Sequence, residues 1–493
     1  MGRYSIESTV WTLAVMTLAA GCGGKEPSGP PPAPTQLAFT VQPGQTLRDS
    51  AIAPAVQVEV RDASGTRIAG ATNTVTLTLG ANPAGATLAG TTTVVAVDGV
   101  ATFGDLRLTE RGRGYTLVAT SGSLTPATGS GFNIVLPLPL YVVQPGTNHT
   151  CAVVGYGVYC WGHNANGELG DGTLTSNALP VRVPFDPPHA SFARLALGES
   201  HTCATTSVAD LYCWGSDSSG QLGIKSQNDR RVSPTLVTGG IGFFWVAAGR
   251  AHTCAVGVPV SDSTYVYCWG ANDHGQVGDS TNVQRTAPVA VAGGISFAVV
   301  TAGTNHTCAI ATATGRTYCW GDNTFGQVGD SSTTARNSPM PVAGAHTFIE
   351  ISAGGNHTCG VTGALEVYCW GENADGQLGD GTTTQRTAPV LVTGGVSFTR
   401  IFVGGQFSCA EANNEALHCW GRNLEGELGI GTFNSVLTPQ PAGSNVSPGV
   451  TGGDRHACAT ALGQVAYCWG SNTFGQLGDG TTTTRPSPVV IVY

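Results

Sequence analysis

Hydrophobic and polar residues alternate with a period of two along most of the chain, in short stretches separated by glycine-rich turns. In the first part of the chain the clearest stretches are Val56–Val60, Val75–Leu79, the residues around Val100, Phe103 and Leu106, and Tyr115–Ala119. Such alternation predicts half-buried strands, and turn-forming clusters such as Asp62–Gly65 separate them. About seven short strands in about 100 residues predict a small β-sandwich over residues 36–136.

From residue 137 the pattern repeats. Versions of the stretch Tyr368–Asp380 recur seven times, with their tryptophans at Trp161, Trp214, Trp269, Trp320, Trp370, Trp420 and Trp469. The steps between these tryptophans are 53, 55, 51, 50, 50 and 49 residues. A period of this length is typical of a solenoid or a propeller.

Each repeat contains four candidate strands. The first ends in a glycine, the second carries His-Thr-Cys-Ala or a variant, and the third carries Tyr-Cys-Trp-Gly. The fourth is expected to follow a proline, because proline suits the first residue or the exposed edge of a strand; these prolines are Pro180, Pro234, Pro288, Pro339, Pro389, Pro439 and Pro488. Four strands in each of seven repeats predict a seven-bladed β-propeller over residues 137–493. Pro488–Val492 is the candidate for the strand that closes the ring.

Composition agrees with an all-β chain. The 70 glycines among 493 residues and the 11% of charged residues fit short strands joined by tight turns, and they disfavour a helical protein. The net charge of −9 argues against a partner held by a basic surface. We therefore expect no nucleic-acid partner.

The cysteines divide into one isolated residue, Cys22, and one pair in each repeat. The pairs are Cys151 with Cys160, Cys203 with Cys213, Cys254 with Cys268, Cys308 with Cys319, Cys359 with Cys369, Cys409 with Cys419, and Cys458 with Cys468. An even set at a repeated spacing in an exported chain predicts disulfides. In an antiparallel hairpin of the second and third strands, the two cysteines of a pair face each other within disulfide range. Reduced core cysteines are the alternative.

The N-terminus has the parts of an export signal. Arg3 precedes an apolar run, Val10–Ala20, that is too short for a membrane span, and small residues follow. Residues 22–35 are rich in glycine and proline and predict a spacer. Leu18–Cys22 resembles a bacterial lipoprotein box, which implies that a signal peptide, residues 1–21, is removed and that Cys22 carries lipid. We expect a cell-envelope protein, anchored to the outer membrane or cell surface by this lipid alone, or else a secreted protein.

Two further resemblances concern whole domains. Val58–Gly65 together with Asp98–Phe103 resembles bacterial immunoglobulin-like stalk domains, which implies a spacer or presenting role for residues 36–136.

The motif Trp-Gly-x-Asn-x-x-Gly-Gln-Leu-Gly-Asp-Gly-Thr, preceded by His-Thr-Cys-Ala, resembles the regulator of chromosome condensation repeat family. That resemblance implies a seven-bladed propeller. The family includes nuclear exchange factors, plant light receptors and a secreted bacterial inhibitor of β-lactamase, so the fold alone assigns no chemistry.

The residues of the motif are expected to be structural. The tryptophans should pack between blades with their indole N–H groups paired, and the asparagines should bond the backbone of their own turns.

Six repeats place a histidine two residues before the first cysteine: His149, His201, His252, His306, His357 and His456. His and Cys could share a zinc ion, but Phe407 stands at this position in the sixth repeat, which favours a packing role. Aspartate-containing turns suggest calcium, but Ile224 and Ile430 replace the aspartate in two repeats, which favours turn formation.

No nucleophile elbow, phosphate loop or paired-acid arrangement is present, and we expect no enzyme activity, no cofactor and no metal. Binding should lie where the repeats differ, at the loop tips. The candidate residues of this binding face are His163, Glu199, Arg250, Asp273, His274, Asp322, Phe325, Glu372, Arg422, Asp454, Arg455 and Phe474. The two phenylalanines are candidate aromatic anchors. The alternative is that these tips are unconstrained turns.

The leading hypothesis is a monomeric module that binds an extracellular or envelope protein, or a glycan. An enzyme that acts on polysaccharide or peptidoglycan in the central channel is the second; carboxylates converging there from different blades would favour it. A purely structural surface protein is the third. An exchange-factor function, by family analogy alone, is disfavoured by export.

Overall fold

The computed structural model describes residues 33–135, 142–155, 157–185, 191–226, 230–258, 264–443, 449–461 and 465–493. The chain divides into two compact units, Met1–Ile134 and Val135–Tyr493, and the regular elements of both are strands. Within these described ranges, no helix has the length and hydrophobicity that a bilayer span needs. The predicted signal, Cys22 and most of the predicted spacer lie outside the described residues.

The first unit is built from twelve short strands around one hydrophobic core. They are β1 (Gln36–Val41), β2 (Thr46–Leu47), β3 (Val56–Arg61), β4 (Thr74–Leu79), β5 (Leu88–Ala89), β6 (Thr93–Val95), β7 (Val100–Phe103), β8 (Arg107–Leu108), β9 (Gly112–Tyr115), β10 (Leu117–Thr120), β11 (Ala127–Thr128) and β12 (Phe132–Val135). The sheets have the orders β1-β3-β7, β11-β10-β4-β6, β2-β12-β9 and β5-β8. Along β3 the three valines point into the core and alternate with partly buried polar residues, as the pattern predicted.

The stretch Tyr115–Ala119 is not one strand, as expected, but two. β9 pairs with β12, whereas β10 pairs with β4 and β11, so the chain passes from one sheet to another at Thr116. Both Tyr115 and Leu117 are fully buried. Alternation of side chains therefore continues across the change of sheet, which is why the sequence pattern does not reveal it.

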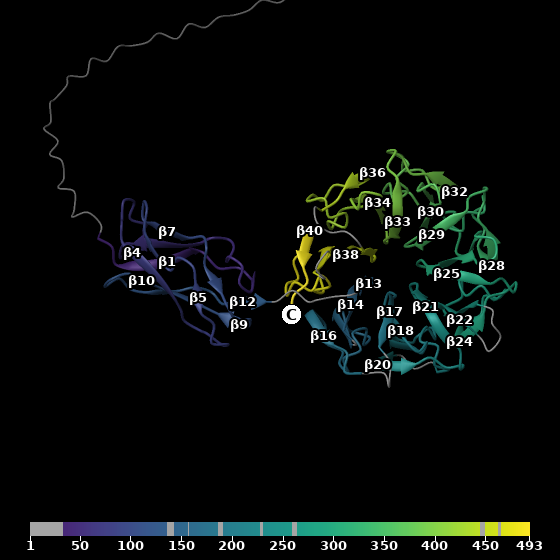
Figure 1. Ribbon diagram of the computed structural model, residues 1–493, viewed down its shortest axis with the longest axis horizontal. Coiled ribbons are helices and arrows are strands. Elements are labelled where there is room, and N and C mark those ends of the chain that lie inside the picture. The colour runs from purple at the N-terminus through teal and green to yellow at the C-terminus, as the bar shows by residue number, and fades with distance from the viewer. Residues whose placement is uncertain are drawn as a thin grey trace, which may run out of the picture. The chain divides into compact units, whose positions relative to one another are not determined.

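In the second unit, sheets of four antiparallel strands follow one another in chain order around a ring (Figure 1). Each sheet is formed by one contiguous repeat, and the described residues form seven such sheets. The first strands lie innermost: β13 (Val142–Pro145), β17 (Phe192–Leu197), β21 (Gly242–Ala248), β25 (Phe297–Ala302), β29 (Phe348–Ala353), β33 (Phe398–Val403) and β37 (Val450–Gly452).

The second and third strands form a hairpin in the middle of each sheet. The second strands are β14 (His149–Val154), β18 (His201–Thr206), β22 (His252–Val258), β26 (His306–Ala311), β30 (His357–Thr362), β34 (Phe407–Ala412) and β38 (His456–Thr460). The third strands are β15 (Gly157–Gly162), β19 (Leu211–Ser216), β23 (Tyr265–Gly270), β27 (Thr317–Gly321), β31 (Val367–Gly371), β35 (Leu417–Gly421) and β39 (Ala466–Gly470). Second strands such as β18 and β30 are buried at every position, because a neighbouring sheet covers each of their faces.

The fourth strands form the outer edges. They are β16 (Asn177–Arg182), β20 (Arg230–Leu236), β24 (Arg285–Ala290), β28 (Arg336–Pro341), β32 (Arg386–Leu391), β36 (Val436–Pro441) and β40 (Arg485–Val490). The expectation that these strands begin at the proline is wrong: Pro288 is the fourth residue of β24. Pairing passes from Cys268↔Val289 to Gly270↔Arg285, so the proline lies in an irregularity of an edge strand, where no ladder hydrogen bond is required of it.

The two cysteines of each repeat face each other across the central hairpin, as predicted. All seven pairs form disulfides, with Cα–Cα distances of 4.0 to 4.1 Å. The bonds join Cys151 to Cys160, Cys203 to Cys213, Cys254 to Cys268, Cys308 to Cys319, Cys359 to Cys369, Cys409 to Cys419, and Cys458 to Cys468. Every one of these cysteines is at most 1% exposed. Each disulfide closes a loop within one sheet and is expected to contribute about 2–3 kcal/mol.

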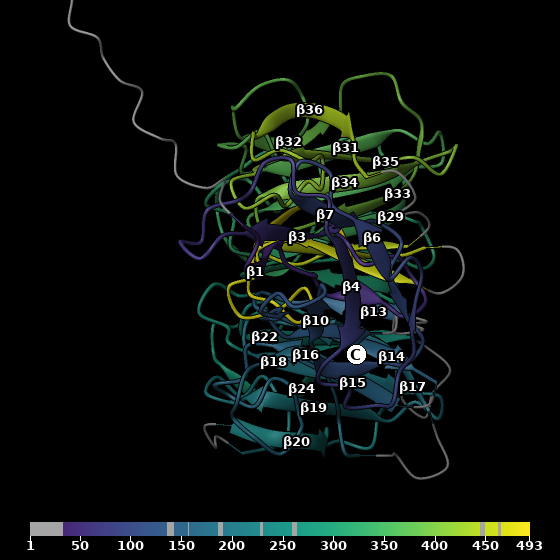
Figure 2. The same ribbon diagram turned by 90° about the vertical axis from the view of Figure 1, so that its left-hand side faces the viewer.

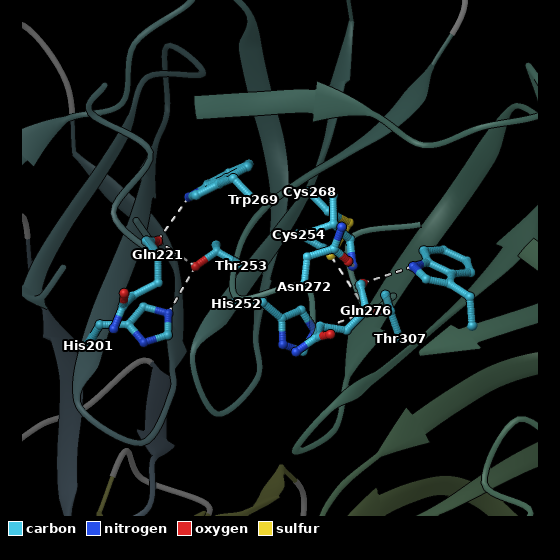
Figure 3. The surroundings of a disulfide bond; sticks show 12 residues. His201, Gln221, His252, Thr253, Cys254, Cys268, Trp269, Asn272, Gln276 and Thr307 are labelled. Atoms are coloured by element: carbon cyan, nitrogen blue, oxygen red, sulfur yellow. Dashed lines mark hydrogen bonds between the residues drawn. A yellow bond between two sulfur atoms is a disulfide. The ribbon is translucent and has the colours of Figure 1, made fainter. Parts of the chain in front are cut away.

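At six of the seven junctions between described sheets, one backbone carbonyl accepts two hydrogen bonds from the neighbouring sheet. At the junction drawn in Figure 3, Trp269 Nε1 and Thr253 Oγ1 both donate to the carbonyl of Gln221, each at 2.9 Å. The Thr253 hydroxyl also lies 2.9 Å from His201 Nε2. Since the hydroxyl proton goes to the carbonyl, the imidazole must donate through Nε2. The predicted packing of the tryptophan between blades, with its N–H paired, is confirmed.

The last sheet packs directly on the first. Thr150 Oγ1 donates to the Gln476 carbonyl at 2.8 Å, and Thr451 Oγ1 donates to the Val143 carbonyl at 2.9 Å. β40, the candidate for closure, is an outer edge strand bonded to β39 within its own repeat, and Ile491 just beyond it enters the core shared with the first sheet. Side-chain packing and hydrogen bonds therefore close the ring, without exchange of a strand.

Candidate functional site

Two regions of the ring could bind a ligand: the central channel and one of the two loop-bearing faces. The strands run between these faces, as the edge-on view in Figure 2 shows. We name the motif face the one formed by the turns between first and second strands and the loops between third and fourth strands. The hairpin face carries the remaining connections.

The central channel encloses about 880 Å³. Its walls are the first strands and the glycine-containing turns that follow them. A volume of this size is typical of a site for a small molecule.

Backbone hydrogen bonds between neighbouring turns encircle the channel at the motif face. The donors and acceptors are Thr147 N to Gly198 O, Glu199 N to Arg250 O, Arg250 N to Thr304 O, Thr304 N to Gly354 O, Gly355 N to Gly404 O, Gly405 N to Gly453 O and Asp454 N to Gly146 O. A Cβ atom on Gly354 would collide with the carbonyl of Gly404, so glycine is required at this close approach. With a spacing of roughly 4.8 Å between bonded neighbours, a circle of seven has a diameter of only about 11 Å between backbones. This end of the channel is therefore constricted.

Carboxylates from three sheets line the channel, and each lies beside an arginine. Glu199 accepts from Arg250 Nε at 2.8 Å at the motif face. Asp454, where burial raises the pKa, lies 3.4 Å from the guanidinium of the adjacent Arg455.

Toward the hairpin face, burial also raises the pKa of Glu350, and the Arg400 guanidinium lies 4.0 Å away. After burial, the charge of Glu199 also contributes to raising the pKa of Asp454, so carboxylates of the second and seventh sheets approach one another in the channel. Each of the three carboxylates nevertheless lies beside an arginine, and ion pairing is the role that these contacts show.

Three groups of the candidate binding-face residues lie together on the motif face. Arg422 and Arg455 share the carboxylate of Glu425, at 3.8 and 3.2 Å. The ring of His163 meets the edge of Phe474 at 4.7 Å between centroids, across the junction of the first and last sheets.

The third group joins the second and third sheets. Arg250 bonds Glu199, and the charge of Asp273 contributes to raising the pKa of Arg250, after the hydrogen bond and charge of Glu199. His274 lies 3.3 Å from the carboxylate of Asp273.

Among the described residues, Asp322, Phe325 and Glu372 form no side-chain hydrogen bond or ion pair with another sheet. Asp322 is 9% exposed and accepts hydrogen bonds from the backbone and hydroxyl of Thr324. Glu372 accepts from Asn356 at 3.1 Å, and Phe325 is half-buried. These residues offer less surface than Phe474, which is 37% exposed.

The aspartate turns that suggested calcium are occupied by protein groups. Asp380 Oδ1 accepts from the Thr382 amide and hydroxyl, and its Oδ2 accepts from Arg386. Burial opposes ionisation of Asp380, but these hydrogen bonds outweigh it and lower its pKa. Asn373 bonds the same aspartate and the Leu378 amide, which completes a turn held by its own side chains.

The repeats match a known sequence family. The family model described as RCC1-like domain matches residues 246–492, and that of the Regulator of chromosome condensation (RCC1) repeat matches residues 157–205 and 209–256. The chain belongs to the RCC1-like family.

Among proteins similar to this RCC1-like chain is the ultraviolet-B receptor UVR8 of Arabidopsis thaliana, 31% identical over 249 residues, which are 48% of this chain and 55% of the receptor. The probable E3 ubiquitin-protein ligase HERC6 of Homo sapiens is 29% identical over 226 residues, 44% of this chain and 22% of the ligase. The chain thus spans 55% or less of the length of these relatives.

Solved structures agree on the fold. Human WBSCR16 superposes with a TM-score of 0.61 at 19% identity, over 68% of this chain and 94% of that one. Yeast RCC1 (Prp20), in its complex with Kap60, superposes with a TM-score of 0.59 at 22% identity, over 72% and 85% of the two chains. The second unit is therefore an RCC1-like β-propeller.

The sequence pattern did not indicate which side chains line this propeller's channel. Arg194, Trp245, Glu350 and Phe402 all line it. A charged or bulky residue within the first strand of a repeat could have indicated a side chain that lines a channel. The sequence alone does not show, however, that the first strands of all repeats line the same channel.

Proposed function

We propose that this chain is an exported, lipid-anchored protein of the cell envelope whose seven-bladed propeller binds another macromolecule through its motif face. The seven four-stranded sheets support the blade count. The first unit would act as an immunoglobulin-like spacer between the lipid and the propeller.

Disulfide chemistry supports the location. Seven disulfides within one chain are typical of an oxidising compartment and rare in the cytosol. The apolar run before Cys22 supplies a route for export. This location also argues against an exchange-factor function by analogy with the family.

A buried tyrosine supports the immunoglobulin-like assignment. Tyr115 is fully buried, and its hydroxyl donates to the carbonyl of Glu110, five residues upstream, at 2.9 Å. A tyrosine whose hydroxyl returns to the backbone a few residues earlier is a hallmark of immunoglobulin-like sandwiches. Nothing in this unit suggests chemistry, so presentation of the propeller is the role we assign to it.

The binding proposal rests on one contrast: the seven sheets share the same internal scaffold, whereas the side chains on the motif face differ from sheet to sheet. Every sheet repeats the tryptophan and disulfide, whereas the motif face gathers Phe474 against His163 and the Arg422, Glu425 and Arg455 group. Aromatic residues and arginines are the side chains that contribute most to protein–protein affinity. The partner that fits best is a protein with both acidic and apolar surface.

The test is affinity capture from envelope extract with the full chain, comparing the wild type with Phe474→Ala/Arg455→Ala. If one bound species depends on the motif face, the double variant should retain it about tenfold less. Phe244→Ala/Arg316→Ala is the matched control, because these two exposed residues lie toward the hairpin face. Equal capture by the wild type and both variants would contradict a motif-face site.

A further inference from the structure

We propose that Arg194 and Trp245 form an anion-binding site inside the channel, near the hairpin face, which takes the carboxylate or phosphate group of a small molecule. The site is separate from the motif face, and its test does not depend on the function proposed above.

Arg194 is a cation without an anionic partner. Within the described residues, no carboxylate lies within 4.0 Å of its guanidinium, and its N–H groups donate no hydrogen bond to a described residue. Arg250 is the other arginine lining the channel, and it is paired with Glu199. Glu199 follows Arg194 by five residues along an extended strand, roughly 16 Å away, so the same carboxylate does not neutralise both arginines.

The guanidinium lies over an indole ring that is itself anchored by a hydrogen bond. Its carbon lies 4.1 Å from the centroid of the Trp245 ring, and Trp245 Nε1 donates to the Val300 carbonyl at 2.9 Å. The indole is therefore fixed between the third and fourth sheets, and the guanidinium lies over its ring. A contact with the ring satisfies none of the N–H donors of the guanidinium by a hydrogen bond to a carboxylate, so these donors are available to an anionic acceptor.

The surroundings of Arg194 make a bound anion more stabilising. Partial burial in the channel lowers the pKa of Arg194, which means that its charge has lost part of its solvation. A bidentate carboxylate or phosphate would restore that interaction through paired charge-assisted hydrogen bonds. Val142 and Val299 line the same cavity and offer apolar contact to the rest of the ligand.

The opposite wall sets a limit on the ligand. Glu350 lines the cavity on the fifth sheet and is held beside Arg400. A ligand with a single anionic group fits this combination better than a polyanion, since a second negative charge would approach Glu350. The channel volume of about 880 Å³ suits a small molecule.

Quenching of tryptophan fluorescence tests the site with defined probes. The chain has 9 tryptophans, and the seven of the repeats are 0% exposed. In the full chain carrying Trp11→Phe, accessible fluorescence should come from Trp245, and Trp245→Phe should remove it. Iodide is the anionic probe and acrylamide the neutral one, at constant ionic strength.

We expect Arg194→Gln to reduce iodide quenching about threefold while acrylamide quenching persists, because a positive charge concentrates anions locally. Arg316→Gln is the matched control and should leave the ratio of the two quenchers unchanged, since that exposed arginine lies in the hairpin turn of the fourth sheet and does not line the channel. In the unsubstituted site, acetate or inorganic phosphate should protect against iodide, and whichever protects identifies the group that is bound. An iodide-to-acrylamide ratio that Arg194→Gln does not change, or protection by neither anion, would overturn the proposal.

Discussion

The junction between the sixth and seventh sheets differs from the six others around the ring. In those six, a histidine of one sheet bonds a hydroxyl of the next: His149–Thr202, His201–Thr253, His252–Thr307, His306–Thr358, His357–Ser408 and His456–Thr150. In the sixth repeat Phe407 replaces the histidine, and in the seventh repeat Ala457 replaces the hydroxyl. Both partners have changed, and both have become apolar.

The two kinds of junction fill the same space. The Phe407 ring packs against Gly404 as the His201 ring packs against Gly198, and Phe407 shares a hydrophobic core with Ala457. Exchanging both members of a buried hydrogen-bonded pair for apolar groups can be nearly neutral, whereas exchanging one leaves a polar group unsatisfied. Because both positions change together, the histidine is one half of a packing unit that spans two repeats. This explains the absence of the histidine from one repeat better than a role as a metal ligand does.

The largest loss of stability should come from truncating the tryptophan, which both kinds of junction share. Trp320→Ala at an ordinary junction and Trp469→Ala at the exceptional one should each lower the free energy of unfolding by about 3–5 kcal/mol, the usual cost of truncating a buried tryptophan. Denaturant titration followed by circular dichroism measures both. A much smaller cost for Trp469→Ala would show that the exceptional junction is loosely packed and that the two kinds of junction are not equivalent.

A smaller loss of stability should come from restoring the histidine of the exceptional junction without its hydroxyl partner. Phe407→His places a buried imidazole opposite the methyl group of Ala457, and we expect a loss of about 1–3 kcal/mol from its unsatisfied N–H and lost apolar contact. Adding Ala457→Thr should recover about 1 kcal/mol of this loss, because the hydroxyl supplies the missing acceptor. A double-mutant cycle without coupling between the two positions would contradict the paired unit.

The two kinds of junction should also differ in their response to acid. Burial lowers the pKa of His306 to about 4, against 6.5 in the unfolded chain. The folded state then binds fewer protons between these values, so the stability from this group is fully present above pH 6.5 and is lost as the pH falls toward 4. His306→Phe/Thr358→Ala, which copies the exceptional junction, should reduce the slope of unfolding free energy against pH by at most about 1.4 kcal/mol per pH unit. An unchanged slope between pH 4 and 6.5 would contradict the assignment of a neutral buried histidine.

Local patterns predicted much of the ring. The spacing of Cys359 and Cys369 predicted a facing pair in a hairpin, and the repeated tryptophan predicted packing between sheets with a bonded N–H. Both depend on contacts that each repeat makes in the same way. The start of the fourth strands was not predicted, because Pro288 sits inside an edge strand where the lack of an N–H is tolerated.

What the sequence could not reveal involves residues far apart in the chain. In the sequence, Phe407 is only an exception to the histidine pattern. Its relation to Ala457 can be recognised only once the structure shows that each histidine bonds the hydroxyl of the following repeat. The contact of Arg194 with Trp245 likewise joins the innermost strands of two neighbouring sheets, and both line a channel whose existence depends on closure of the whole ring.

The proposed location outside the reducing cytoplasm depends on a ring in which every sheet is clamped by its own disulfide. The direct measurement is peptide mass spectrometry of the protein taken from its native cells, with free thiols blocked at lysis and no reductant added. We expect seven cross-linked peptide pairs, each joining the two cysteines of one repeat. Blocked free thiols at those fourteen positions would contradict it.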